Sequence, residues 1–240
     1  METNNIPQMT DSAKEGFIFS INKPKDWTSF DVVKKLRGIT RIKKIGHAGT
    51  LDPFATGVLL LCIGKATKQI HKLMDLPKEY EAQLELGAET DTLDITGKVV
   101  DTRPVPSLSP AEIQEVLEDF KGKITQRIPD YSAAKVGGRR LYKLAREGKE
   151  VPERYKDVEI YDIKFFEYRD KIISFSVLCS RGTYVRTLGS DIARKLGTVG
   201  HIKSLVRTKI GEYTLENSLD LLQFEQQWKQ MIANENISQH

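Results

Sequence analysis

Residues 78–87 read KEYEAQLELG, and apolar and polar side chains alternate along the whole stretch. The apolar positions are Tyr80, Ala82, Leu84 and Leu86. Because successive side chains of a strand point to opposite faces, this period of two predicts a strand with one buried and one solvated face. Such half-buried strands are typical of antiparallel sheets.

Another strand pair is predicted as a hairpin. Residues 160–180 form two apolar runs with a turn near Arg169 and Asp170. A helix is predicted after Ser29, which is its expected N-cap. Further strands are predicted at 17–22, 57–64 and 201–211, and further helices at 65–76, 109–120 and 187–197. This irregular alternation predicts an α+β (mixed α/β) fold with a central, mainly antiparallel sheet flanked by helices.

The composition is that of a soluble globular protein. Of 240 residues, 39% are hydrophobic and 29% are charged, and no apolar run is long enough to span a bilayer. The start, METNNIPQMTDSAKEG, lacks the apolar core of a signal peptide, so we expect a cytoplasmic protein. The two cysteines, Cys62 and Cys179, lie in apolar runs, which predicts buried, reduced thiols.

The net charge of +4 is unevenly distributed along the chain. Lys and Arg, with aromatic residues between them, are concentrated in residues 23–44 and 135–146, whereas residues 105–120 are acidic. This asymmetry predicts a basic face that can bind a polyanion such as a nucleic acid.

A glycine-rich loop at residues 46–57, GHAGTLDPFATG, places a carboxylate directly before a proline. Pro53 biases Asp52 toward extended geometry, and the glycines permit close approaches of the backbone. The buried strand predicted at 57–64 anchors the far side of the loop. Local composition favours an ordinary Asp-Pro turn, and a catalytic carboxylate on an anchored loop is the alternative.

Other candidate motifs near this loop carry less information. Residues 57–67 contain Gly-Lys and a threonine, but Ala66 replaces the Ser or Thr of a phosphate-binding loop, so we reject that motif. No Cys/His cluster has zinc spacing, and no metal site is expected at His47. Asp91 and Asp94 are expected on opposite faces of a strand, in turn or hairpin roles.

Residues 179–192, CSRGTYVRTLGSDI, lead from a strand into a helix. Strand alternation places Tyr184 and Arg186 on one face just before that helix. An aromatic ring and a guanidinium there can stack on a base and pair with a carboxylate or a phosphate. The alternative is an ordinary ion pair between Arg186 and a surface acid.

Six stretches, taken in order, resemble the bacterial tRNA pseudouridine synthases of the TruB type. They are residues 23–33, 46–68, 78–94, 131–148, 179–192 and 200–216. The resemblance implies the pseudouridine synthase fold and the conversion of uridine 55 in the T-loop of tRNA to pseudouridine. The glycosidic bond would break, and the base would rotate and rejoin through C5, without a metal or a cofactor. The target nucleotide would first leave its stack.

The resemblance also implies roles for individual residues. Asp52 matches the catalytic aspartate, which acts either as nucleophile or as base at C2′. Tyr80 matches the tyrosine that stacks on the target base, and Arg186 matches the arginine that pairs with the aspartate and would keep it ionised. The positions that match those lining the flipped nucleotides are His47, Tyr184 and Leu205.

Two positions depart from the family pattern. Asp26 stands where glycine is usual, and Ile128 replaces the first of two prolines. The predicted domains are a disordered tail at 1–16, a catalytic domain at 17–222, and a C-terminal helix and tail at 223–240 without a full PUA domain. The expected partner is the T-arm of tRNA, and we expect a monomer that does not bind membranes. The alternatives are a non-catalytic RNA-binding or RNA-remodelling module, and a synthase that acts on another RNA.

Overall fold

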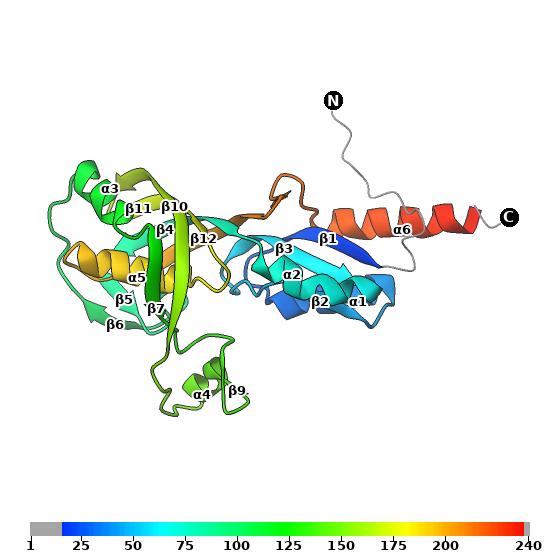
Figure 1. The fold of residues 1–240 in the computed structure, drawn as a ribbon, viewed down its shortest axis with the longest axis horizontal. Helices are drawn as coiled ribbons and strands as arrows, with labels where there is room; N and C mark the ends of the chain where they lie inside the picture. The colour runs from blue at the N-terminus through cyan, green and yellow to red at the C-terminus, as the bar shows by residue number, and fades with distance from the viewer. Residues whose placement is uncertain (1–15, 238–240) are drawn as a thin grey trace. The chain divides into compact units, whose positions relative to one another are not determined.

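The computed structural model describes residues 16–237, which divide into two compact units. Unit 1 contains the residues up to Leu76 and those from Arg207 onward, and unit 2 contains Pro77–Val206. Figure 1 shows the helices and strands of both. Apart from Gly16, the disordered tail predicted for residues 1–16 lies outside the described residues.

The sheet of unit 1 has the strand order β1-β3-β12. Strand β3 (Thr56–Ile63) pairs antiparallel with both β1 (Phe17–Lys23) and β2 (Ile45–His47). Strand β12 (Gly200–Ile210) contributes its last residues, and the short strand β13 (Tyr213–Thr214) pairs antiparallel with it. From Gly57 onward every residue of β3 is buried, which explains the unbroken apolar run in its sequence.

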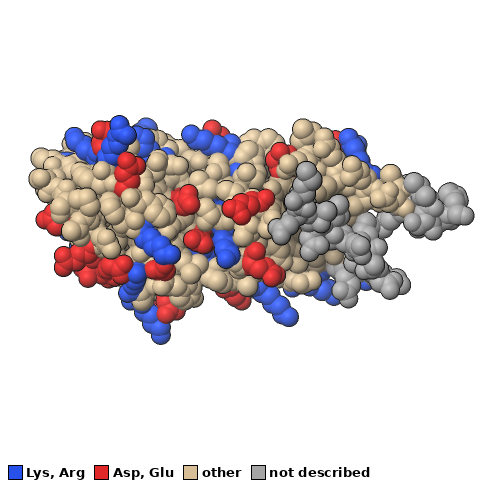
Figure 2. Space-filling model, turned by 90° about the horizontal axis from the view of Figure 1, so that it is seen from above, with Lys and Arg blue, Asp and Glu red and all other residues tan. Residues whose placement is uncertain are grey.

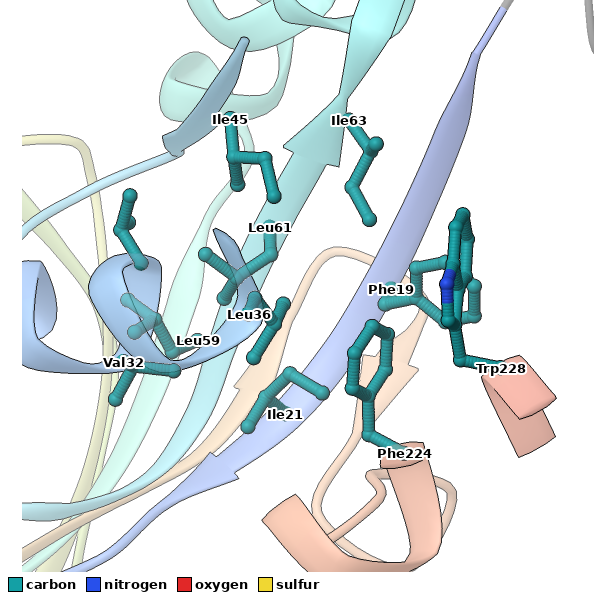
Figure 3. Close-up of a cluster of buried hydrophobic side chains, with 11 residues drawn as sticks. Phe19, Ile21, Val32, Leu36, Ile45, Leu59, Leu61, Ile63, Phe224 and Trp228 are labelled. Atoms are coloured by element: carbon teal, nitrogen blue, oxygen red, sulfur yellow. The ribbon is translucent and has the colours of Figure 1, made fainter. Parts of the chain in front are cut away.

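Alternate side chains of β3 enter two different apolar clusters of unit 1. Leu59 and Leu61 pack with side chains of α1 (Ser29–Thr40) and with Phe224 and Trp228 of α6 (Leu221–Ile237), as Figure 3 shows. Leu60 and its even-numbered neighbours pack on the opposite face. That face is covered by a 3-10 helix, η2 (Gly64–Gln69), and by α2 (Ile70–Asp75).

Two helix predictions in unit 1 need correction. The N-cap of α1 is Thr28, whose hydroxyl accepts a hydrogen bond from the Asp31 N–H, and Ser29 is the first helical residue. Both residues suit a cap, but Asp31 lies three residues after Thr28 and completes a capping box with it. The helix predicted at 65–76 is 3-10 in its first half, and its end before Pro77 is as predicted.

The sheet of unit 2 has the strand order β12-β4-β11-β10-β7. Strand β4 (Lys78–Leu86) pairs antiparallel with β11 (Ile172–Cys179), β11 with β10 (Tyr155–Arg169), and β10 with β7 (Gly122–Arg127). The alternation predicted for β4 is confirmed, since Tyr80, Ala82, Leu84 and Leu86 are all buried. The predicted hairpin is confirmed as well, with Asp170 at a positive φ of 50° in its turn.

Helices and small hairpins complete unit 2. Helix α3 (Pro110–Glu118) begins with the predicted capping box of Ser109 and Glu112, and α5 (Val185–Lys195) begins two residues earlier than predicted. The remaining elements are the hairpins β5 (Ala88–Thr90) with β6 (Val99–Thr102) and β8 (Lys135–Val136) with β9 (Arg139–Arg140), and α4 (Leu141–Arg146).

The predicted α+β class with a mainly antiparallel sheet is confirmed, because the strand pairs described above are antiparallel. Cys62 and Cys179 are free and buried, as predicted. Within residues 16–237, no helix combines the length and the apolar character that a membrane crossing requires.

Candidate active site

In unit 1, the glycine-rich loop joins β2 to β3 and carries Asp52 near its middle. Leu51 and Phe54 are buried, Pro53 is exposed, and Asp52 is half-buried. The carbonyl of Asp52 accepts a hydrogen bond from the Ala55 N–H at 3.2 Å, so the Asp-Pro sequence does form a turn. The turn places Leu51 and Phe54 in the core and Asp52 at its edge, where the residue is partly exposed.

The residue before Asp52 is held by Ser29 of α1. The Ser29 hydroxyl accepts a hydrogen bond from the Leu51 N–H at 2.9 Å and donates to the Leu51 carbonyl at 3.2 Å. Ser29 is only 2% exposed, so both backbone groups of Leu51 are satisfied away from water by one side chain. This contact fixes the chain directly before the carboxylate.

The residue after Asp52 is held by Lys23, at the end of β1. The fully buried Lys23 ammonium donates to the carbonyls of Trp27, Pro24 and Pro53 at 2.6, 2.8 and 3.1 Å. Burial lowers the pKa of Lys23 to about 8, although the negative charge of Asp52 acts in the opposite direction. Lys23 therefore links the loop that contains Pro24 and Trp27 to the loop that carries Asp52, and it places a positive charge near Asp52.

Asp26 explains one departure from the family pattern. Its φ is +65°, a left-handed conformation that glycine adopts without strain and that aspartate tolerates better than most residues. Its N–H donates to the Pro53 carbonyl at 2.8 Å. The substitution therefore preserves the backbone shape that closes this loop against the Asp52 turn.

In unit 2, Arg186 lies on the first turn of α5 and Tyr184 is the N-cap, so the strand predicted for these two residues is wrong. The strand ends at Cys179, and the turn at Ser180–Thr183 breaks the alternation. The guanidinium of Arg186 is 3% exposed and donates to the carbonyls of Thr92 and Tyr131 at 2.6 and 3.0 Å.

The acid that pairs with Arg186 inside unit 2 is Asp94, at 3.6 Å. The expected turn role of Asp94 is confirmed, because its Oδ1 accepts hydrogen bonds from the hydroxyls of Thr92 and Thr96 and from the Thr96 N–H. Those bonds leave Oδ2 facing the guanidinium. Asp94 is 4% exposed, so this is a buried ion pair rather than the surface pair considered as an alternative.

Three more predicted site residues belong to unit 2. Tyr80 lies on β4 and Leu205 on the neighbouring strand β12, and both are largely buried. The backbone of Tyr184 is held by the buried Gln126 side chain, which accepts from its N–H at 3.0 Å and donates to its carbonyl at 3.3 Å. In unit 1, His47 is the last residue of β2 and is half-buried.

Two models of protein families match this chain. The model for the TruB family pseudouridylate synthase (N terminal domain) matches residues 37–185, and the model for the tRNA pseudouridylate synthase B C-terminal domain matches residues 186–240. The chain belongs to the TruB family. It is thus a pseudouridine synthase, an isomerase.

Relatives of this TruB-family chain cover most of its length. It is 45% identical over 204 residues to "tRNA pseudouridine synthase B" of Clostridium tetani, which covers 85% of this chain and 71% of that protein. It is 40% identical over 233 residues to the protein of the same name from Phocaeicola vulgatus, which covers 94% of this chain and 99% of the relative.

The fold also matches a solved structure described as "Crystal Structure of a Cbf5-Nop10-Gar1 Complex". The match has a TM-score of 0.69 and 28% sequence identity, and it covers 89% of this chain. This chain spans about half of that solved chain, because the covered share is 54%. The pseudouridine synthase fold expected for this TruB-family chain is therefore confirmed.

The local sequence analysis did not predict how Lys23, Ser29 and Asp94 hold the site. A signal for Lys23 was present, because the alternation of β1 places it on the buried face with Phe19 and Ile21. No such signal exists for Ser29 or Asp94, whose partners lie far along the chain. Among residues 16–237, no group of three or more His, Cys, Asp or Glu is arranged to hold a metal ion.

Proposed function

We propose that this TruB-family chain isomerises uridine 55 in the T-loop of tRNA to pseudouridine, with Asp52 as the catalytic carboxylate. The main support is the geometry of the Asp52 turn: Leu51 and Pro53 are both held by buried side chains, and Asp52 between them is half-buried. Relatives named tRNA pseudouridine synthase B support the same substrate class.

The proposed reaction is an isomerisation that needs no co-reactant. The N1–C1′ bond breaks, the uracil ring turns, and a C5–C1′ bond forms. C5 then loses its proton and N1 gains one, so that product and substrate have the same composition. Asp52 takes part either by attacking C1′ or by removing a proton from C2′, and both routes require an ionised carboxylate at the sugar.

The other predicted site residues have supporting roles in the proposal. Tyr80 stacks on the flipped base, an interaction worth about 1–3 kcal/mol. Arg186 is assigned the role of the family arginine that pairs with the catalytic aspartate. The carbonyls and the carboxylate that surround its guanidinium support this role, because they orient the side chain before the RNA binds. The remaining residues that line the nucleotides are His47, Tyr184 and Leu205.

RNA binding is proposed to use exposed cations, of which α1 carries several. Lys34, Lys35 and Arg41 line an open hollow of about 820 Å³ between α1 and α6, together with Trp27. Its lining also includes the acidic residues Asp26, Asp31 and Glu225. Trp27 also belongs to the loop that Lys23 ties to Pro53. The face shown in Figure 2 carries both signs of charge interspersed, so the phosphate contacts are assigned to local clusters rather than to that whole face.

A tritium-release assay tests the proposed function. The purified chain is incubated with an unmodified tRNA transcript labelled with tritium at C5 of its uracils, and C5 substitution releases the label. The proposal predicts release equivalent to one uridine per tRNA, and no release from a transcript with cytidine at position 55. Absence of release from the first transcript would reject the activity, and mapping in total RNA would reveal a different target.

A further inference from the structure

We infer that Arg207 is a positioning residue that sets the geometry of the Asp52 turn. Arg207 lies on the part of β12 that belongs to unit 1, and it is 1% exposed. It is among the largest fully buried side chains of the described chain. The inference rests on the proposed function, because it concerns how the catalytic carboxylate is presented.

The Arg207 guanidinium connects the two ends of the loop that carries Asp52. On one side it donates to the carbonyls of Gly49 and Thr50 at 3.3 and 3.4 Å. On the other side its Nε donates to the Val58 carbonyl, at the start of β3, at 2.7 Å. One rigid planar group therefore sets the separation of the chain before and after the turn.

The charge of Arg207 is unusual for its surroundings. Within residues 16–237, its hydrogen bonds go to those three backbone carbonyls and it forms no ion pair. A buried charge without a charged partner costs several kcal/mol, and the three hydrogen bonds to backbone carbonyls offset part of that cost. The presence of arginine is explained if loop geometry, rather than stability, is what the position requires.

The glycines of the loop fit the same arrangement. Gly57 has a φ of +105°, and a Cβ there would lie 2.2 Å from the Arg207 carbonyl oxygen, so only glycine lets β3 begin directly against Arg207. Lys23 also bonds this loop, at the Pro53 carbonyl, and the positive charge of Arg207 contributes to the lowered pKa of Lys23. Asp52 is thus carried on a loop held by two buried cations.

Because of this geometry, loss of the Arg207 side chain should affect the catalytic rate and the affinity for RNA differently. Arg207 is buried and its hydrogen bonds go to backbone carbonyls, so its loss would not remove a contact with RNA. A displacement of about 1 Å of a catalytic group lowers the rate about 100-fold. The inference therefore predicts a defect in the chemical step at saturating RNA, with RNA affinity preserved.

The test compares Arg207→Met and Arg207→Lys with Arg37→Met. Arg37 is a matched control, because it also donates to a backbone carbonyl of unit 1, that of Ile45 at 3.0 Å, but not to the loop. At a temperature where all variants are folded, Arg207→Met should lower the single-turnover rate about 100-fold, with the Kd for tRNA within 2-fold. Arg207→Lys should recover part of the rate, and Arg37→Met should keep it within 2-fold.

Amide hydrogen exchange gives a readout that does not depend on activity. Exchange at residues 49–58 should accelerate at least about tenfold in Arg207→Met, and exchange in α6 should be unchanged. A normal rate together with normal loop exchange would overturn the inference. If the methionine variant fails to fold, the lysine variant decides by the same two measurements. If the wild-type chain forms no pseudouridine, the proposed function fails, and loop exchange alone still tests the positioning role.

Discussion

Replacing Ser29 with alanine tests whether the Asp52 turn is held from α1. The substitution removes one hydroxyl that makes two hydrogen bonds with Leu51, and it leaves the N–H and the carbonyl of Leu51 buried without that partner. Each lost bond costs about 1 kcal/mol, and the buried polar groups add to that cost, so we expect a loss of about 3 kcal/mol in the free energy of unfolding. For a chain of this size, that loss lowers the Tm by about 10 °C.

The same substitution should also affect catalysis, since Leu51 directly precedes Asp52. We expect about a tenfold lower single-turnover rate at saturating tRNA, measured well below the Tm of the variant. Ser20→Ala is the control: the Ser20 hydroxyl bonds that of Ser218 at 2.6 Å in the same unit, without contact to the loop. It should cost about 1 kcal/mol and leave the rate unchanged. A Ser29→Ala variant with wild-type Tm and rate would refute the reasoning.

Three further predictions concern RNA binding, pH and the core. Charge reversal of Lys34 and Lys35 should raise the Kd for tRNA about tenfold and flatten its salt dependence, and an unchanged salt slope would place the contacts elsewhere. Because the pKa of Lys23 falls from 10.5 to about 8 on folding, the unfolded chain binds more protons at this residue between those pH values. The free energy of unfolding should therefore rise from pH 8 to 10.5, by up to about 3 kcal/mol, and urea titrations of Lys23→Met should lack this rise. Phe224→Ala should cost about 4 kcal/mol in urea unfolding, whereas Leu222→Ala, at a position that is 65% exposed, should cost little.

The local patterns of the sequence were sufficient to predict most elements. The alternation in β4, the unbroken apolar run of β3 and the capping box of Ser109 each depend on residues within one turn or one strand. Such local patterns predict the folded structure correctly because local backbone geometry and burial in the fold require the same residue types. The fold class followed from them.

One error was local, because the turn at Ser180–Thr183 ends the strand before Tyr184 and Arg186. The omissions concern contacts between distant parts of the chain. Asp31 completes a capping box with Thr28, which is a local signal for the cap, whereas the hydrogen bond of Ser29 to Leu51 spans 22 residues. Asp94 pairs with Arg186 across 92 positions, which no local period records. The site was predicted through the family resemblance, and the residues that hold its loops became evident from the packing.

The most direct test of the proposed mechanism is the pseudouridine yield of Asp52→Asn. Asparagine has nearly the same size as aspartate but carries no charge, so the turn held by Ser29 and Lys23 should keep its shape. We predict that pseudouridine at position 55 falls to the background of the assay, while the Kd for tRNA stays within about 3-fold and the Tm is nearly unchanged. Pseudouridine formation by the purified variant at a rate near that of the wild type would contradict the assignment of Asp52.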